Sequence, residues 1–405
     1  MSSNSEKEKA KKKPSRASLK KKRYKNRIIK LIYLNKSLSI LDIINKMQLS
    51  APTVQTLLNE LMEEQFVEVK GTGTSSGGRR PNLFGLVENS MYVLSIDIGR
   101  HSTRFAIFNV GNKNVTGIRY LPVILENNMK VIDEIHAFAN KVISESDIDK
   151  KKIIGIGLDM PGLIDSVKGK NYTFFNFEKP LKTILEEKFK MPVVISNDAH
   201  AKASAEFRFG MARGKKNVVV VHLGWGLGTG LILDGKLYRG ANGFSGEFAH
   251  IPMQENGYLC NCGKKGCLET IVSAMALTRN VVSALQAGEE SIITSLVENN
   301  LDLVEPNIIL QAAKSGDQFA IKAFSELGHD LGRGLAVLVQ TLNPELIVLG
   351  GILAKAEKYL TTSVEQSLQS YTIPNIRHGV KIVNSRLGDE ANLLGCVINL
   401  MESEY

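Results

Sequence analysis

The stretch Val93-Leu94-Ser95-Ile96-Asp97-Ile98-Gly99 places a run of aliphatic residues before a carboxylate and a glycine. This pattern is typical of a buried strand that ends in a tight turn. Residues 103–110 have the composition of a second strand, so the two segments predict a β-hairpin. Further short apolar runs follow at 153–158, 193–196, 218–222, 229–233 and 346–349. Strands that alternate with helical segments and end at glycines indicate an α/β body with a ligand-binding cleft.

The charge of the chain is concentrated at one end. The 405 residues include 51 Lys and Arg against 41 Asp and Glu, a net charge of +10. Residues 1–90 hold 18 of the basic and 8 of the acidic residues, and the remaining 315 hold 33 of each. A basic module on a neutral body predicts a polyanion partner, nucleic acid before membrane. A solubilising lysine-rich tail is the alternative.

Composition argues against a membrane or exported protein. No apolar run approaches the roughly 20 residues that cross a bilayer, and the polar start is unlike a secretory signal. Three of the four cysteines fall within eight residues, which suits a metal site better than a disulfide framework. We therefore expect a cytoplasmic protein with no membrane partner.

The N-terminal region divides into a tail and a folded module. Residues 1–18 are rich in Ser and Lys and predict a disordered basic tail. Residues 19–88 predict a winged helix-turn-helix domain, with one helix from about Lys20, a second over 40–47 capped by Ser39, and a third capped by Ser50. The third helix offers small polar side chains to a major groove. These predicted DNA contacts are Thr53, Gln55, Thr56 and Asn59.

A β-hairpin follows the three predicted helices. Segments 66–69 and 83–87 have the composition of strands and flank a glycine-rich turn at 71–78. Arg79 and Arg80 in this wing are expected to meet the DNA backbone or the minor groove. The module could instead serve dimerisation, but the wing and the charge favour binding to operator DNA.

Three motifs make the body similar to a known family. They are GKLYRGANGFSGE at 235–247 followed by His250, CNCGKKGCLE at 260–269, and the segment 343–351. The chain resembles the ROK (repressor, ORF, kinase) family over about residues 20–400. The resemblance implies an actin-like/hexokinase fold of two α/β lobes around a sugar-binding cleft, here residues 89–405. The segment 76–81 resembles the repressor branch, which includes xylose and N-acetylglucosamine repressors.

The cysteine cluster predicts a zinc site on its own chemistry. His250, Cys260, Cys262 and Cys267 supply one nitrogen and three sulfurs, a closed tetrahedral set for Zn²⁺ within the loop 250–267. Four protein ligands leave no open position, so the metal is expected to be structural. Three free buried cysteines are the alternative.

The family's sugar-binding positions match a set of polar residues that could pair with adjacent hydroxyl groups. By resemblance, the set is Asn197, Asp198, Glu247, His250 and Glu269. His250 would bind zinc through one ring nitrogen and face a hydroxyl with the other. In the segment 168–180, Asn171 and Asn176 are both candidates for a further sugar contact.

The nucleotide loops depart from those of the family's kinases. Asp198 matches the catalytic base, but the first hairpin has Asp97-Ile-Gly99-Arg-His-Ser where the kinases have Asp-Ile-Gly-Gly-Thr-Lys. Trp225 precedes Gly226 in place of a phosphate-binding threonine, and Gly350-Gly351-Ile replaces a triple glycine. These departures predict a degenerate nucleotide site and a lost kinase activity.

Together these features predict a sugar-responsive transcriptional repressor of carbohydrate metabolism genes that is not an enzyme. A sugar or sugar phosphate in the cleft would set the affinity for operator DNA. A homodimer or homotetramer is expected, because two half-sites multiply operator affinity. One alternative is an ATP-dependent sugar kinase with Asp198 as its catalytic base and an accessory DNA-binding domain. Another is a sugar-binding scaffold that acts through protein partners.

Overall fold

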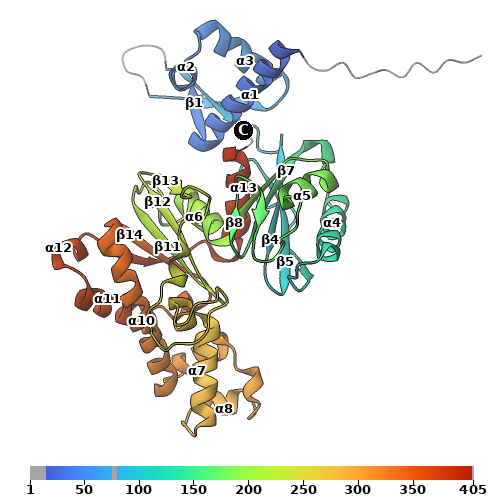
Figure 1. Ribbon diagram of the computed structural model, residues 1–405. Coiled ribbons are helices and arrows are strands. Elements are labelled where there is room, and N and C mark those ends of the chain that lie inside the picture. The colour runs from blue at the N-terminus through green and yellow to red at the C-terminus, as the bar shows by residue number, and fades with distance from the viewer. Residues whose placement is uncertain (1–14, 75–79, 404–405) are drawn as a thin grey trace, which may run out of the picture.

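The computed structural model describes residues 15–74 and 80–403, and it contains a small N-terminal domain and two larger α/β lobes (Figure 1). Most of the predicted tail and the wing residue Arg79 lie outside the described residues. Within the described ranges, no helix combines the length and the apolar composition needed to cross a membrane.

The N-terminal domain has three helices and a three-stranded sheet in the order β1-β3-β2. Its elements are α1 (Arg16–Asn35), β1 (Ser37–Ser39), α2 (Ile40–Met47), α3 (Ala51–Glu63), β2 (Val67–Thr72) and β3 (Asn82–Leu86). The prediction that residues up to 18 are disordered is wrong at its end, because α1 already begins at Arg16. The Ser15 hydroxyl accepts a hydrogen bond from Ser18 N and caps this helix. Strand β1 was not predicted.

Lobe 1 (92–197) is a five-stranded sheet in the order β10-β7-β4-β5-β6. Strands β10, β7 and β4 are parallel, and β5 and β6 continue the sheet antiparallel. The sheet strands are β4 (Tyr92–Ile98), β5 (Ser102–Asn109), β6 (Arg119–Pro122), β7 (Ile153–Met160) and β10 (Val193–Asn197). Its remaining elements are α4 (Met129–Ser144), η1 (Lys150–Lys152), β8 (Ile164–Asp165), β9 (Lys170–Asn171) and α5 (Leu181–Phe189).

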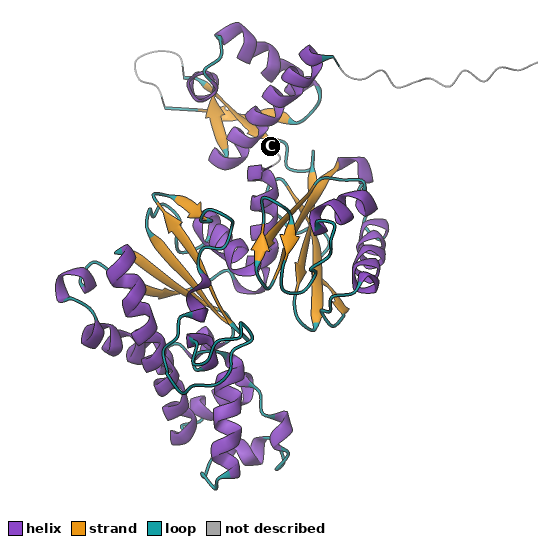
Figure 2. Cartoon of the chain, viewed as in Figure 1, coloured by secondary structure: helices purple, strands orange, loops and turns teal. Residues whose placement is uncertain are grey.

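Lobe 2 (218–384) repeats this plan in the strand order β13-β12-β11-β14-β15, with helices beside its sheet (Figure 2). Its strands are β11 (Val218–Leu223), β12 (Leu227–Leu233), β13 (Lys236–Tyr238), β14 (Leu346–Gly350) and β15 (Lys381–Asn384). Its α-helices are α7 (Ala274–Gln286), α8 (Ile292–Leu296), α9 (Pro306–Lys314), α10 (Gln318–Leu342), α11 (Lys358–Tyr371) and α12 (Pro374–Arg377). Its short 3₁₀ turns are η2 (Glu247–His250), η3 (Leu268–Thr270), η4 (Leu301–Leu303) and η5 (Leu353–Ala356).

Two helices join the lobes. Helix α6 (Asp198–Phe209) follows β10 and packs against β12, and α13 (Ala391–Ser403), which follows η6 (Gly388–Glu390), packs on α6 and on β4 and β7. A Cβ at Gly395 would lie 2.0 Å from Ala201 O, so the two helices approach too closely there for any side chain. The hinge region between the lobes is therefore tightly packed.

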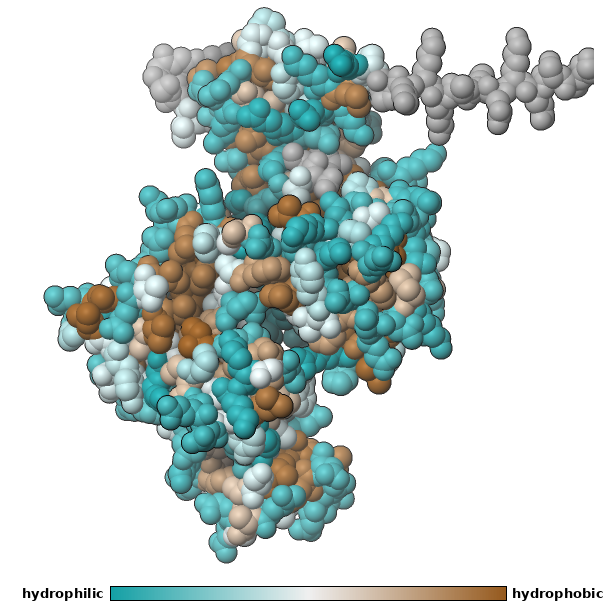
Figure 3. Space-filling model, in the orientation of Figure 1, coloured by the Kyte–Doolittle hydropathy of each residue, from teal (hydrophilic) through white to brown (hydrophobic). Residues whose placement is uncertain are grey.

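The N-terminal domain shares an apolar core with helix α13. Ile28 and Ile32 of α1 belong to the same buried cluster as Val397, Leu400 and Met401 of α13. The end of α13 accordingly lies at the junction between this domain and the lobes (Figure 1). The visible surface of the N-terminal domain is mostly hydrophilic (Figure 3). Most of its apolar side chains are therefore buried, either at the junction or in the interior of the domain.

Candidate sugar and metal sites

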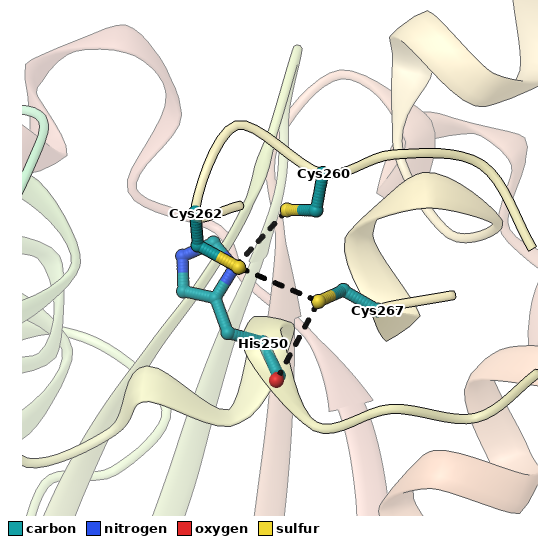
Figure 4. A group of neighbouring side chains, drawn as sticks. All are labelled: His250, Cys260, Cys262 and Cys267. Atoms are coloured by element: carbon teal, nitrogen blue, oxygen red, sulfur yellow. Dashed lines mark hydrogen bonds between the residues drawn. The ribbon is translucent and has the colours of Figure 1, made fainter. Parts of the chain in front are cut away.

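Four candidate metal ligands come together after β13. His250 Nδ1 lies 3.4 Å from Cys260 Sγ, and Cys262 Sγ lies 3.6 Å from Cys267 Sγ. All four ligand atoms lie within 4.8 Å of one another, and the side chains point toward a common centre (Figure 4). Zn–S bonds of about 2.3 Å in a tetrahedron would place sulfurs about 3.8 Å apart, so the donor set fits four-coordinate Zn²⁺.

Tight turns hold the cysteines at this spacing. Cys260 N donates a hydrogen bond of 2.8 Å to Lys264 O. Gly266 has φ of +72°, and a Cβ there would lie 1.7 Å from Gln254 O, so only glycine can occupy the turn. The residues between the ligands therefore fold the loop into a compact unit.

Two of the predicted sugar-binding carboxylates border the metal cluster. His250 Nε2 lies 3.6 Å from Glu247 Oε2, on the side of the ring away from Cys260. Glu269 Oε1 lies 4.0 Å from Cys260 Sγ, and its other oxygen accepts a hydrogen bond from Leu227 N. The ring of His250 thus faces the cysteines with one nitrogen and a carboxylate with the other.

The acidic side chains influence one another across a shared space. Burial raises the pKa of Glu247 to about 7, and the negative charges of Asp198 and Glu269 add to the effect. Burial also raises the pKa of Asp198. The structure therefore brings Glu247, His250 and Glu269 together around the cluster, and the charge of Asp198 acts on Glu247.

Asn197 is largely occupied by the fold. Its Oδ1 accepts a hydrogen bond of 2.9 Å from Ala199 N as the N-cap of α6, and its Nδ2 donates to Gly162 O at 3.1 Å. One amide hydrogen is left for a ligand. The neighbouring Asp198 uses Oδ1 to accept from Ala199 N, which leaves Oδ2 for other contacts.

The two asparagines of the segment 168–180 differ in environment. Asn171 is fully buried; its Oδ1 accepts from Thr173 N and Phe174 N, and its Nδ2 donates to Pro161 O. Asn176 is exposed. Asn171 therefore positions this segment through its own backbone contacts, and Asn176 stays a candidate for a sugar contact.

Arg104 lies on β5, next to the first of the loops predicted to form a degenerate nucleotide site. The Arg104 guanidinium on β5 donates to Asp97 Oδ2 from both Nε and Nη2, and the Nε distance is 2.7 Å. Its Nη1 donates to Asp389 O just before α13. The Asp97 carboxylate is thus paired within the protein. Gly99 keeps the hairpin tight, because a Cβ there would lie 2.8 Å from Ser102 O.

The second loop also has local partners. Trp225 at its tip is 53% exposed, and a Cβ at Gly226 would lie 2.6 Å from Glu269 Oε2. The imidazole of His222 lies beneath both glycine loops, 2.7 Å and 2.9 Å from where a Cβ would stand at Gly224 and Gly351. Gly351 adopts a positive φ of +94°, whereas Gly350, the last residue of β14, does not have a positive φ.

Four charged or polar residues whose charges act on one another around Asp97 and Asp198, here called the cleft floor, were not predicted from the sequence: Arg104, Asp159, Lys202 and His222. Asp159 on β7 lies beside Asp97 on β4 in the parallel register, and Asn392 Nδ2 donates to its Oδ2 at 2.8 Å. Burial, with the adjacent Asp97 charge, holds the pKa of Asp159 well above its usual range. In the sequence, Asp159 lies at the end of an apolar strand, and no neighbouring motif indicates its role.

The helix-turn-helix presents the predicted face of α3. Its four predicted DNA contacts are exposed: Thr53, Gln55, Thr56 and Asn59. Arg80 in the wing is exposed as well, while Arg79 lies outside the described residues. Ser50 precedes α3 as predicted, but its hydroxyl contacts the Thr53 hydroxyl at 2.8 Å instead of capping a backbone N–H.

Comparisons with known proteins agree with this architecture. The model of the ROK family matches residues 93–402. A xylose repressor of Caldicellulosiruptor bescii is 31% identical over 373 residues, 91% of this chain and 93% of that protein. A glucokinase of Halalkalibacterium halodurans is 31% identical over 308 residues, 75% of this chain and 93% of that protein.

The similarity to a solved structure extends through the N-terminal domain. The crystal structure of a ROK family transcriptional regulator, a homologue of the Escherichia coli Mlc protein, has a TM-score of 0.78 and 26% identity. The match covers 94% of this chain and 95% of that one. The two lobes have the actin-like arrangement of hexokinase-type proteins, as expected. The chain belongs to the ROK family.

Proposed function

We propose that this protein is a sugar-responsive transcriptional repressor that acts on operator DNA in the cytoplasm. The observation that carries the proposal is the course of helix α13. It begins at the cleft floor, packs along α6 behind the sugar site, and ends in the core of the winged domain. A ligand that changes the lobe arrangement therefore has a direct packed connection to the DNA-binding domain.

Two buried asparagines of this helix make polar contacts with its neighbours. Near its start, Asn392 donates to Asp159 at the end of β7. In its middle, Asn399 donates to Ser196 on β10 and accepts from Ser204 on α6. These buried hydrogen bonds fix α13 to both elements that flank Asp198. A shift of α6 on sugar binding would strain them, because buried polar groups that lose their partners are costly.

Contacts with operator DNA would come from α3 and the wing. Exposed Gln55 and Asn59, whose side chains are hydrogen-bonded to each other at 2.8 Å, can pair with adenine edges. A relative named as a xylose repressor and the solved ROK family transcriptional regulator both match through this region. Two copies of the domain in a homodimer or homotetramer would read two half-sites of one operator.

Contacts with the sugar would come from the carboxylates beside the metal cluster. We propose that Asp198, Glu247 and Glu269 accept hydrogen bonds from sugar hydroxyls, with Asn197 and His250 as further contacts. Zn²⁺ on His250 and the three cysteines would be structural and would hold the loop wall rigid. Glu247 and Glu269 would then keep their spacing whether or not the sugar is present.

A kinase is the second candidate, supported by the glucokinase relative and by Asp198 at the family's catalytic position. Against it stand the internal pairing of Asp97 with Arg104 and the imidazole of His222 beneath the two glycine loops. The first feature pairs Asp97 within the protein, and the second places a ring next to glycines that a nucleotide would approach. We therefore propose that ATP turnover has been lost.

The experiment runs one sugar panel in two assays. Hexoses, pentoses, amino sugars and their phosphates are tested for a rise in melting temperature and, with Mg²⁺ and ATP, for coupled ADP release. We expect at least one ligand to raise the melting temperature without ADP release. Sugar-dependent ADP release would favour the kinase instead.

A further inference from the structure

Lys202 places an ammonium group in the floor of the cleft. It lies on α6 one turn after Asp198, and its side chain is only 15% exposed. Helical side chains lean toward the N-terminus of their helix, so this one reaches back toward the cleft. Its Nζ lies 4.0 Å from Asp198 Oδ2, and residues 15–74 and 80–403 supply it with no hydrogen bond. The three donors of a mostly buried cation are therefore unused.

His222 lies near this ammonium. It ends β11 below the loops of Gly224 and Gly351, and its ring makes no hydrogen bond within the described ranges. Burial, together with the positive charges of Lys202 and Arg104, holds the pKa of His222 well below its usual range. A neutral imidazole keeps one N–H donor, so His222 adds a further unused donor to the cleft floor.

The surrounding carboxylates do not supply the Lys202 ammonium with a hydrogen-bond acceptor. Asp97 is already paired with two nitrogens of Arg104. Asp159 is buried beside Asp97 with a raised pKa, which favours its neutral form. Among the described residues, Asp198 has the carboxylate nearest to the ammonium, and its Oδ2 lies 4.0 Å from Nζ, beyond hydrogen-bonding distance. A buried ammonium without acceptors is costly, so the arrangement favours an added anionic oxygen.

We propose that Lys202 and His222 form an anion subsite beside Asp198, and that the effector is a sugar carrying a phosphate ester or a carboxylate. This inference rests on the proposed function and names its ligand class. The sugar hydroxyls would lie on Glu247 and Glu269, and the anionic group would extend past Asp198 toward Lys202.

The test compares neutral and anionic forms of the same sugars by isothermal titration calorimetry. The ligands are glucose, gluconate and glucose 6-phosphate, N-acetylglucosamine and its 6-phosphate, xylose and xylose 5-phosphate, and inorganic phosphate. The variants are Lys202→Met, Lys202→Arg and His222→Asn. Lys215→Met serves as the matched control, since Lys215 pairs with Glu345 away from the cleft. Comparing the affinity for gluconate with that for the sugar phosphates shows whether the subsite prefers a carboxylate or a phosphate ester.

We expect one anionic ligand to bind at least about tenfold more tightly than its neutral counterpart. Loss of a charge-assisted hydrogen bond in Lys202→Met should weaken that ligand by about tenfold to a hundredfold, with the neutral sugar unchanged. Lys202→Arg should retain most of the preference. If Lys202→Met does not fold by circular dichroism, His222→Asn provides the same comparison, with a smaller expected loss.

Two results would overturn the subsite. One is a neutral sugar that binds the wild-type protein as tightly as its anionic form. The other is a Lys202→Met variant that weakens both forms equally. Operator binding that responds to a neutral sugar would leave the proposed function intact while removing the subsite. Absence of binding by every ligand would overturn both.

Discussion

The Glu402 carboxylate at the end of α13 pairs with the Arg208 guanidinium at the end of α6, with an Nη2–Oε1 distance of 2.5 Å. The backbone oxygen of Glu402 also accepts a hydrogen bond from Lys30 Nζ on α1. One residue therefore joins α6 and α13 to α1 of the proposed DNA-binding domain. This junction is where a movement of α6 would reach the winged domain.

Breaking this junction should uncouple the two functions. In Glu402→Gln the ion pair with Arg208 is lost, but both groups are partly exposed, so the cost in unfolding free energy should stay below about 1 kcal/mol. The effect of the effector on operator affinity should fall several-fold, as measured by fluorescence anisotropy with and without ligand. Lys188→Met, which breaks the ion pair with Asp133 in lobe 1, is the control. An unchanged ligand effect in Glu402→Gln would remove the junction from the mechanism.

Zinc and sugar response should be lost together in Cys262→Ser. Removing one of four ligands opens the tetrahedral site, and the loop that carries Glu247 and Glu269 would lose its support. Plasma mass spectrometry should find one zinc per wild-type chain and much less in the variant. Cys396→Ala changes a buried cysteine outside the cluster and should keep its zinc. A zinc-depleted Cys262→Ser protein with a normal sugar response would contradict the structural role of the metal.

The wing should contribute to affinity through phosphate contacts. Replacing Arg79 and Arg80 by alanine should weaken operator binding and reduce the slope of log K against log salt by about 1 to 2. Anisotropy titrations at several salt concentrations measure this slope. Arg119→Ala changes an exposed arginine on β6 of lobe 1 and should leave it unaltered. If the double variant keeps the wild-type slope, the wing makes no phosphate contact.

Asp159 should make stability depend on pH. A pKa raised in the folded state gives a stabilising contribution that is present below the unfolded value and lost as pH rises through the folded value. Asp159→Asn mimics the protonated form and keeps an acceptor for Asn392. Its melting temperature should therefore exceed that of the wild type by about 1 °C per kcal/mol relieved. Differential scanning calorimetry from pH 5 to pH 9 should show the difference growing with pH; a constant or reversed difference would mean that Asp159 is ionised.

Local patterns allowed much of the fold to be predicted from the sequence. Strands such as β4 and β7 are continuous apolar runs, and the metal ligands after His250 lie within a few residues of one another. Helix α1 extends to Arg16 because a cap at Ser15 outweighs the polar composition of this segment. Composition alone gave no indication of this cap.

The cleft floor could not be predicted, because its contacts join distant parts of the chain. Asn392 and Asp159 are separated by 233 positions, and Asn399 and Ser196 by 203. Lys202 on a helical surface would ordinarily face solvent, and only the position of α6 between the lobes turns it inward. The same holds for the link from α13 to the winged domain, which no local pattern indicates.

The most direct test of the central claim is the affinity of the full-length protein for its operator, selected from genomic fragments, with and without each ligand of the sugar panel. Fluorescence anisotropy at fixed salt gives both values. We predict sequence-specific binding whose affinity changes tenfold or more with at least one sugar or sugar derivative, without ATP. Binding that shows no sequence preference, or that no ligand of the panel alters, would contradict it.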